Sequence, residues 1–342
     1  MGRTLDVATG SGGLALLASR HSGIVVATDI SERAVSLARL NAAMNGIEFD
    51  CRVGDLFQPV ADDAPFDLIF ANLPFVVSPD NSFTFRDGGR GGDALSRDAV
   101  TAAAGRLAVG GVAVMLCNWI VPDGATWDEP LREWVEPLAC DCLALHHTTE
   151  LPDAYARRWN EFLLVQDPPR YAAAVERWEE AYRRWGTAGI AAGALVLRSR
   201  AGDGVSWFHS LSMEVVPAGD GGSQLLRAVH NLDQLSGVDD EALLRRTVGL
   251  VGNHRLEQSM SYDGSWSMEP ARMVLQDTAG PVGTIDPLAI HAILRLDGVT
   301  PLGVICDSVV ADTGLAATDI VGNTVATCRR LLEAGCLESA GS

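Results

Sequence analysis

The feature that most constrains the fold is a strand, a glycine-rich loop, a helix and a second strand within the first 29 residues. The run TLDVA (4–8) predicts a short strand, TGSGG (9–13) a tight loop, and LALLASRH (14–21) a helix. The β-branched run IVVATD (24–29) predicts a second strand that ends in an acid. Two successive strands joined by a helix lie parallel, so this segment predicts the start of a doubly wound α/β sheet.

The alternation of strands and helices continues through the first half of the chain, so we expect a seven-stranded, mostly parallel sheet with helices on both faces. Helices are predicted at 31–46 and 94–111, and further strands at 47–55, 66–72, 112–119, 142–149 and 160–166. Prolines cannot continue a strand ladder, and Asp167-Pro168-Pro169 follows the last of these strands. We therefore expect the first domain to span 1–168.

The remainder predicts an α+β accessory region over 169–284 and a helix-turn-helix or winged-helix-like piece over 285–342. A helix is expected at 170–185, whose aromatic residues fall on one face and are expected in a core. Strands are predicted at 192–200 and 206–216, helices at 224–237 and 240–251, and a hairpin around Tyr262-Asp263-Gly264.

Charge and hydropathy weigh against two classes of protein, those that bind nucleic acid and those that span a membrane. The chain has 342 residues, a formal net charge of −18 and 26 basic residues, all of them arginine. Tight nucleic-acid binding draws on many phosphate contacts, so this charge weighs against it without excluding it. No stretch of about 18 uncharged apolar residues predicts a membrane span, and the first ten residues lack a signal-peptide pattern. We expect a cytoplasmic protein with no membrane association.

Neither the cysteines nor the histidines predict a metal site. The seven cysteines are scattered, and Cys140 and Cys142 lack a second pair at zinc-like spacing. The neighbours His146 and His147 would face opposite sides of a strand, so we expect no catalytic base there.

The glycine loop predicts a site for a cofactor that carries a nucleoside. Glycines at 10, 12 and 13 allow a sharp turn and a close approach to a ligand. Asp29 ends the next strand, 19 residues after Gly10, where a carboxylate can bind ribose hydroxyls. Asp6 ends the first strand; it would repel a pyrophosphate but can orient the loop and face an ammonium group. A cofactor that carries an amino acid therefore fits better than a dinucleotide.

The pattern (V/L)D(V/L)xxGxGG resembles motif I of class I S-adenosylmethionine-dependent methyltransferases, over about residues 2–167. The resemblance implies a Rossmann-like methyltransferase domain with S-adenosyl-L-methionine as cofactor. It implies that Asp55 bonds the adenine amino group and that Leu56 and Phe57 wall the adenine ring. The cofactor contacts expected on this basis are Asp6, Ala8, Thr9, Gly10, Ser11, Gly12, Asp29, Ile30, Asp55, Leu56 and Asn72.

In the same family, members that methylate amino groups carry (N/D/S)PP(Y/F) after the fourth strand, where this chain has ANLPF (71–75). An amide or base amino nitrogen is a poor nucleophile because its lone pair is delocalised. We expect Asn72 and the carbonyl group of Leu73 to accept its two N–H groups, with Pro74 fixing the backbone and Phe75 stacking on the planar target. Leu73 replaces the usual first proline, and Phe75 replaces the usual tyrosine.

Three hypotheses for the function stay open, of which two differ in the group that accepts the methyl. The segment 85–111, rich in glycine and acid at its start, resembles release factor glutamine methyltransferases and favours a protein glutamine, in a translation factor or a ribosomal protein. The second hypothesis is an RNA or DNA base amino group, and the third a non-catalytic binding protein on a degenerate methyltransferase scaffold. The family has at least one helix before its first strand, whereas here the strand starts near Met1, so we expect weak cofactor binding.

Overall fold

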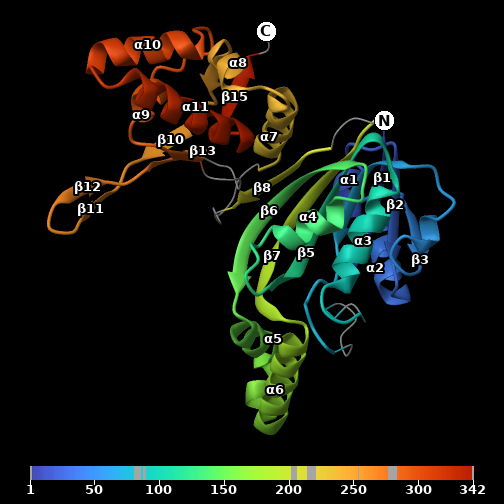
Figure 1. The fold of residues 1–342 in the computed structure, drawn as a ribbon. Coiled ribbons are helices and arrows are strands. Elements are labelled where there is room, and N and C mark those ends of the chain that lie inside the picture. Colours follow the sequence, from blue (N-terminus) through green and yellow to red (C-terminus); the bar gives the residue numbers. More distant parts are fainter. Residues whose placement is uncertain are drawn as a thin grey trace. The chain divides into compact units, whose positions relative to one another are not determined.

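The structure is a computed structural model that describes residues 2–80, 86–87, 90–201, 206–213, 221–252, 254–275 and 283–340. The chain forms two compact units, Met1–Ser210 and Leu211–Ser342, drawn in Figure 1. Each unit is considered by itself below.

The first unit is built on one large sheet with the strand order β3-β2-β1-β4-β5-β7-β6-β8. The strands are β1 (Arg3–Val7), β2 (Ile24–Asp29), β3 (Asp50–Val53), β4 (Phe66–Asn72), β5 (Leu107–Pro122), β6 (Cys140–Glu150), β7 (Thr187–Ser199) and β8 (Phe208–Ser212). Strands β1 to β5 pair in parallel, and β7 is antiparallel to both of its neighbours. The predicted mostly parallel sheet is confirmed, with β8 as an eighth strand.

Helices cover both faces of this sheet. On one face, α1 (Gly13–Ala18) and α2 (Glu32–Met44) pack on Val25 and Ala27 of β2. Val26, between them, points to the other face and joins the core beneath α3 (Ala94–Ala104) and α4 (Glu129–Val135). Alternate residues of one strand thus enter two separate cores, as a doubly wound sheet requires. A short 3-10 helix, Gln58–Val60, follows β3.

The sequence prediction was wrong at residues 160–166, which belong to helix α5 (Pro152–Gln166) rather than to a strand. A second helix, α6 (Pro168–Arg184), follows directly, because proline is well suited to the first turn of a helix. The antiparallel strand of the sheet is β7, which overlaps the strand expected at 192–200 in the accessory region. The expected boundary at residue 168 therefore falls inside the first unit.

Within its described residues, the second unit contains three small sheets and a core between helices. Its elements are α7 (Gly221–Leu235), α8 (Asp240–Leu244), β9 (Thr247–Leu250), β10 (His254–Glu257), β11 (Met260–Tyr262), β12 (Trp266–Met268), β13 (Ala271–Leu275), β14 (Gly283–Ile285), α9 (Ile290–Ile293), α10 (Leu302–Thr313), α11 (Ala317–Glu333) and β15 (Leu337–Ala340). The expected hairpin is confirmed, since β11 pairs with β12. The helix expected over 240–251 ends at Leu244, because Thr247–Leu250 pairs with β15.

A tight turn with Gly314 in the left-handed region separates α10 from α11, and the winged-helix comparison stays an expectation. Within the described residues, no helix has the length and apolar character needed to cross a membrane. The same residues hold no cluster of three or more histidine, cysteine or acidic side chains arranged to bind a metal ion.

Candidate cofactor and acceptor site

The glycine loop leaves β1 through left-handed backbone. Gly10 and Gly12 have φ values of +56° and +85°, and Ala8 also has a positive φ of 55°. A Cβ added to Gly12 would lie 3.0 Å from the Cβ of Ala38 on α2, so the loop presses closely on that helix. A Cβ added to Gly10 would meet no atom within 4 Å, which leaves the outer side of the loop open to a ligand.

Asp6 supports this loop from inside the domain. Its side chain is buried, and one carboxylate oxygen accepts the Thr9 hydroxyl at 2.6 Å and the backbone N–H of Ala15 at 3.0 Å. Burial raises the pKa of Asp6 to about 6, although both hydrogen bonds oppose that shift. Asp6 therefore ties the loop to the start of α1, as expected of a residue that orients it.

Asp29 holds the other side of the loop. Its two carboxylate oxygens accept the backbone N–H of Gly10 at 2.9 Å and of Ser31 at 2.8 Å. A carboxylate offers about four acceptor positions, so two backbone bonds leave capacity for a ligand. Ile30, the next residue, is 62% exposed, so its side chain can pack against a ligand bound at Asp29. The contact between Asp29 and a ribose stays a prediction.

The residues after β3 form a third part of the site. Asp55 is exposed and Leu56 is partly buried with a positive φ of 45°, while the Leu56 carbonyl accepts the Thr28 hydroxyl at 3.0 Å. Phe57 is only 7% exposed and packs in the core, and its expected contact with an adenine ring stays a prediction. Sequence reasoning missed Arg90, which lies 3.3 Å from the Asp55 carboxylate.

Asn72 ends β4 at the same edge of the sheet. Val7 is aligned with Thr28 of β2 and with Ala71 of β4, so the residues that follow on all three strands leave the sheet side by side. The Asn72 side chain is exposed and forms no hydrogen bond within the described part of the chain. It is aligned with Leu116 of β5, which is 43% exposed.

The three residues after Asn72 behave differently from one another. The Leu73 side chain is 3% exposed and packs in the core of the domain, so it anchors the chain where the family has a proline. Pro74 and Phe75 are partly exposed. Acceptance of a substrate N–H by the Leu73 carbonyl, and stacking on Phe75, stay predictions.

The chain beyond Phe75 docks on helices α5 and α6, and the sequence offered no signal for this contact. Tyr155 on α5 bonds Val77 from within the expected first domain, whereas Tyr182 of α6 bonds Val77 from the region expected to be a separate accessory domain. Arg177 and Trp178 of α6, which bond Asp80, come from that same region. The aromatic face expected on 170–185 is confirmed as core for Trp178 and Tyr182, which are 0% and 1% exposed. His146 stacks on Trp127, with ring centroids 4.7 Å apart, and its Nε2 bonds the Thr149 hydroxyl.

The part of the chain that resembles known proteins includes the glycine loop and the ANLPF segment (71–75). A family model described as a methyltransferase domain matches residues 4–86. Ribosomal protein L11 methyltransferase of Symbiobacterium thermophilum is 38% identical over 147 residues, or 40% of this chain and 43% of that protein. Release factor glutamine methyltransferase of Deinococcus radiodurans is 42% identical over 82 residues, or 23% of this chain and 29% of that protein.

A ribosomal protein uL3 glutamine methyltransferase of Bradyrhizobium diazoefficiens is 42% identical over 78 residues, or 22% of this chain and 24% of that protein. The chain thus spans less than half the length of these curated relatives. A solved methyltransferase structure from Pyrococcus furiosus aligns with a TM-score of 0.36 and 16% identity over 58% of this chain and 76% of that one. The first part of the chain resembles class I methyltransferases of the release factor and ribosomal protein type.

Proposed function

We propose that this chain is an S-adenosylmethionine-dependent methyltransferase that methylates a planar amide nitrogen of a protein, with a glutamine side chain as the favoured acceptor. The observation that carries the proposal is the position of Asn72. Its exposed side-chain amide lies at the carboxyl end of β4. Because Ala71 is aligned with Val7 of β1, Asn72 lies beside the start of the glycine loop.

The residues at this edge fit the proposed cofactor. Gly10 offers an open backbone surface, and Asp29 keeps acceptor capacity for ribose hydroxyls. Exposed Asp55 would accept the adenine amino group, with Leu56 and Ile30 beside the ring. When bound, the cofactor supplies an electrophilic methyl group on a sulfonium centre.

The chain's own residues would bind and orient the acceptor nitrogen. The Asn72 side-chain carbonyl accepts one N–H group of the substrate amide, and the Leu73 backbone carbonyl accepts the other. Accepting both bonds localises the nitrogen lone pair and fixes its direction. Positioning and preorganised dipoles supply the rate enhancement, so no general base on the enzyme is required.

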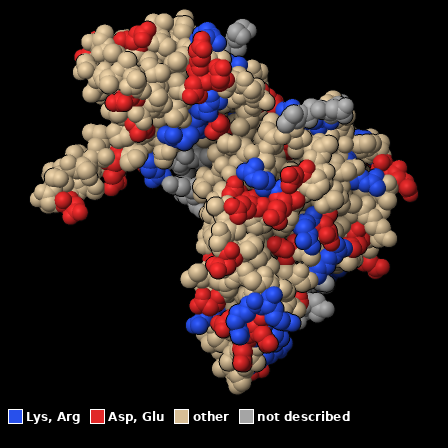
Figure 2. Space-filling model, in the orientation of Figure 1, with Lys and Arg blue, Asp and Glu red and all other residues tan. Residues whose placement is uncertain are grey.

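Two observations favour a protein acceptor over a nucleic acid. The relatives named above are methyltransferases of ribosomal proteins and of a release factor. The chain carries a net charge of −18, and acidic and basic side chains are interspersed on the face drawn in Figure 2. A nucleic-acid site would gather arginines into a continuous basic surface.

The test is transfer of a radiolabelled methyl group from S-adenosylmethionine into a cell extract, followed by nuclease or protease digestion. Label that survives nuclease and is lost to protease supports a protein acceptor, whereas the converse supports an RNA or DNA base. Cofactor binding without any transfer would support a non-catalytic scaffold. Asn72→Ala should abolish transfer and change cofactor affinity little, whereas Asn323→Ala on α11 should change neither. Normal turnover by Asn72→Ala would overturn the role of Asn72.

A further inference from the structure

Helices α5 and α6 are not needed to close the sheet. Glu150 at the end of β6 is aligned with Ile190 of β7, and these strands are antiparallel neighbours. An antiparallel pair can be joined by a turn of a few residues. Instead, two helices that pack on each other extend from the end of β6 and β7, as Figure 1 shows. The connection between β6 and β7 is therefore longer than joining the two strands requires.

The two helices bond both backbone polar groups of Val77, in the loop that follows β4 (residues 73–80, the acceptor loop). The Tyr155 hydroxyl of α5 accepts the Val77 N–H at 3.2 Å, and the Tyr182 hydroxyl of α6 donates to the Val77 carbonyl at 2.8 Å. Both tyrosines are 1% exposed. The Asn118 side chain of β5 donates to the same Tyr155 hydroxyl at 2.7 Å, which fixes the tyrosine relative to the sheet.

A second group of bonds holds the loop three residues further on. The Asp80 carboxylate accepts two bonds from the Arg177 guanidinium group, at 3.0 and 2.9 Å, and one from the Trp178 indole at 2.8 Å. Burial acts to raise the pKa of Asp80, but the hydrogen bonds from Arg177 and Trp178 outweigh it and leave the pKa below its usual value. The carboxylate is therefore ionised at neutral pH, where a bidentate pair is strongest.

Apolar packing completes this attachment. Val76 and Val77 lie in a buried cluster with Tyr155, Trp178 and Tyr182. Two hydroxyls, a carboxylate and this cluster thus fix residues 76–80, while Leu73 is buried in the main core of the domain. The short segment from Asn72 to Phe75 is held at both of its ends.

We propose that α5 and α6 form a positioning module that sets the acceptor loop, and with it Asn72, in the geometry required for methyl transfer. This inference rests on the proposed function of Asn72. Tyr155, Tyr182 and Arg177 are positioning residues that act through the loop and do not contact the reacting atoms. Displacement of a positioned group by about 1 Å can lower a rate about 100-fold, so a fixed loop has catalytic value.

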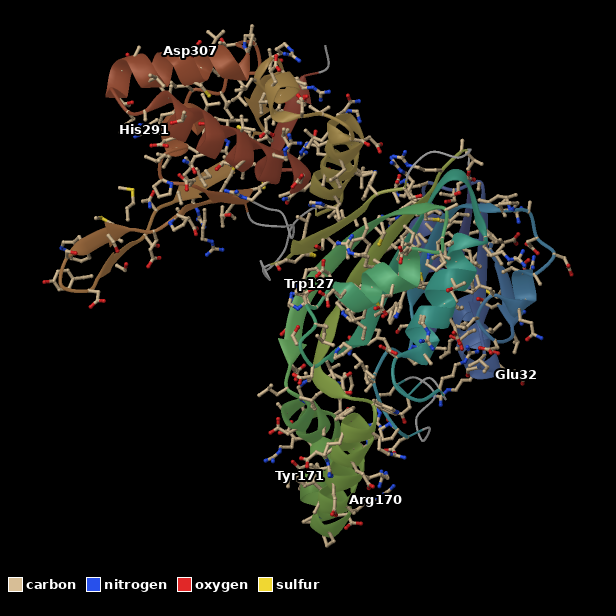
Figure 3. The ribbon with its side chains drawn as sticks, viewed as in Figure 1. Glu32, Trp127, Arg170, Tyr171, His291 and Asp307 are labelled. Carbon is tan, nitrogen blue, oxygen red and sulfur yellow. The ribbon has the colours of Figure 1, made fainter. Side chains whose placement is uncertain are left out.

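The test uses the full chain with Tyr155→Phe, Tyr182→Phe and the double variant, each of which removes a hydroxyl and keeps the ring. Tyr171→Phe is the matched control, because Tyr171 lies on α6 and its hydroxyl has no hydrogen bond within the described residues (Figure 3). A second set of variants, Asp80→Asn and Arg177→Gln, removes the ion pair on the surface and perturbs the core less. Its control is Arg170→Gln, at an exposed position of α6 that is also labelled in Figure 3.

Three measurements separate positioning from support of the fold. Amide hydrogen exchange reports protection at Val77, and calorimetry with S-adenosylmethionine reports cofactor affinity. Radiolabel transfer into a dilution series of extract separates kcat from the apparent KM. We expect Val77 to lose protection, cofactor affinity to stay unchanged, and kcat of the folded enzyme to fall about 10- to 100-fold in the double variant.

The outcomes distinguish this inference from the proposed function. Wild-type kcat in the double variant, with Val77 unprotected, would overturn the positioning role and leave the function of Asn72 standing. Loss of activity only in proportion to loss of folded protein would likewise overturn it, because the helices would then support the fold alone. If both tyrosine variants fail to fold, the comparison of Arg177→Gln with Arg170→Gln decides by the same criteria. Absence of transfer by the wild-type chain would overturn both proposals.

Discussion

The guanidinium group of Arg90 lies 3.3 Å from the carboxylate of Asp55 and joins the second residue after β3 to the loop before α3. The same guanidinium group pairs with Asp98 of α3. The Arg90 and Asp55 side chains are 38% and 51% exposed, so their attraction is screened by solvent. The Arg90 contact occupies one of the two oxygens of the carboxylate that is expected to accept the adenine amino group.

Arg90→Gln should therefore strengthen cofactor binding, because Asp55 would no longer be shared. Exposed ion pairs contribute about 0 to 1 kcal/mol, so the dissociation constant should fall about fivefold at most. Calorimetry with S-adenosylmethionine measures the change, and Arg97→Gln on α3 is the matched control. Weaker binding by Arg90→Gln would show that the arginine holds the cofactor instead of competing with it.

Asp29→Asn should weaken cofactor binding for two reasons. Asparagine has one acceptor oxygen, so it cannot bond the N–H groups of both Gly10 and Ser31 as the carboxylate does. It also loses charge-assisted bonds to the ribose, each of which contributes about 1.5 to 3 kcal/mol, or about 10- to 100-fold in affinity. Glu32→Gln, labelled in Figure 3, removes an equal charge from the exposed start of α2 and should change little. Equal effects in both variants would indicate only a loss of nearby charge.

The placement of three site residues was predictable because each lies at or near the end of its own strand. Asp6, Asp29 and Asn72 lie in β1, β2 and β4 at or near their carboxyl ends, and parallel strands bring those ends to one edge. The local sequence was sufficient to predict these positions. A short apolar run indicates the strand, and the polar residue at its end marks where the chain leaves the sheet.

The sequence pattern did not predict the structure where tertiary contacts between distant residues decide it. Four successive apolar residues at 162–165 favoured a strand, but Leu164 and Val165 are 46% and 91% exposed on α5. A short apolar run does not by itself distinguish a helix from a strand. The contacts of Arg90 with Asp55 and of Arg177 with Asp80 join residues 35 and 97 positions apart. Single-sequence spacing holds no information on such pairs, and the positioning role that we propose for α5 and α6 rests only on contacts in the folded chain.

Gly12→Ala should destabilise the domain, whereas Gly13→Ala should not. Alanine at position 12 would adopt a φ of +85° and place its Cβ 3.0 Å from that of Ala38. Left-handed backbone costs a residue with a Cβ about 1 to 2 kcal/mol before any contact is counted. At Gly13 the added Cβ meets no atom within 4 Å, and alanine favours the helix. Chemical denaturation of both variants measures this contrast, and similar losses would contradict the close packing of the loop on α2.

The raised pKa of Asp6 predicts two pH effects of opposite direction. In the folded chain its pKa is about 6, against 3.8 for the unfolded reference, so the folded state binds the proton more tightly. This contribution to the free energy of unfolding is complete below the unfolded value and is lost as pH rises through about 6. Cofactor affinity should change the other way, because protonated Asp6 is a weaker acceptor for Thr9 and Ala15, which hold the loop.

Comparison with Asp6→Asn isolates this group from the other titrating residues. Between about pH 8 and about pH 5, the unfolding free energy of the wild type should rise by about 1 kcal/mol relative to the variant. Over the same interval, cofactor affinity of the wild type should fall and that of Asp6→Asn should stay level. Asp62→Asn, at an exposed position, should follow the wild type in both measurements. A stability difference between wild type and Asp6→Asn that does not vary with pH would contradict a buried, titrating carboxyl group beneath the loop.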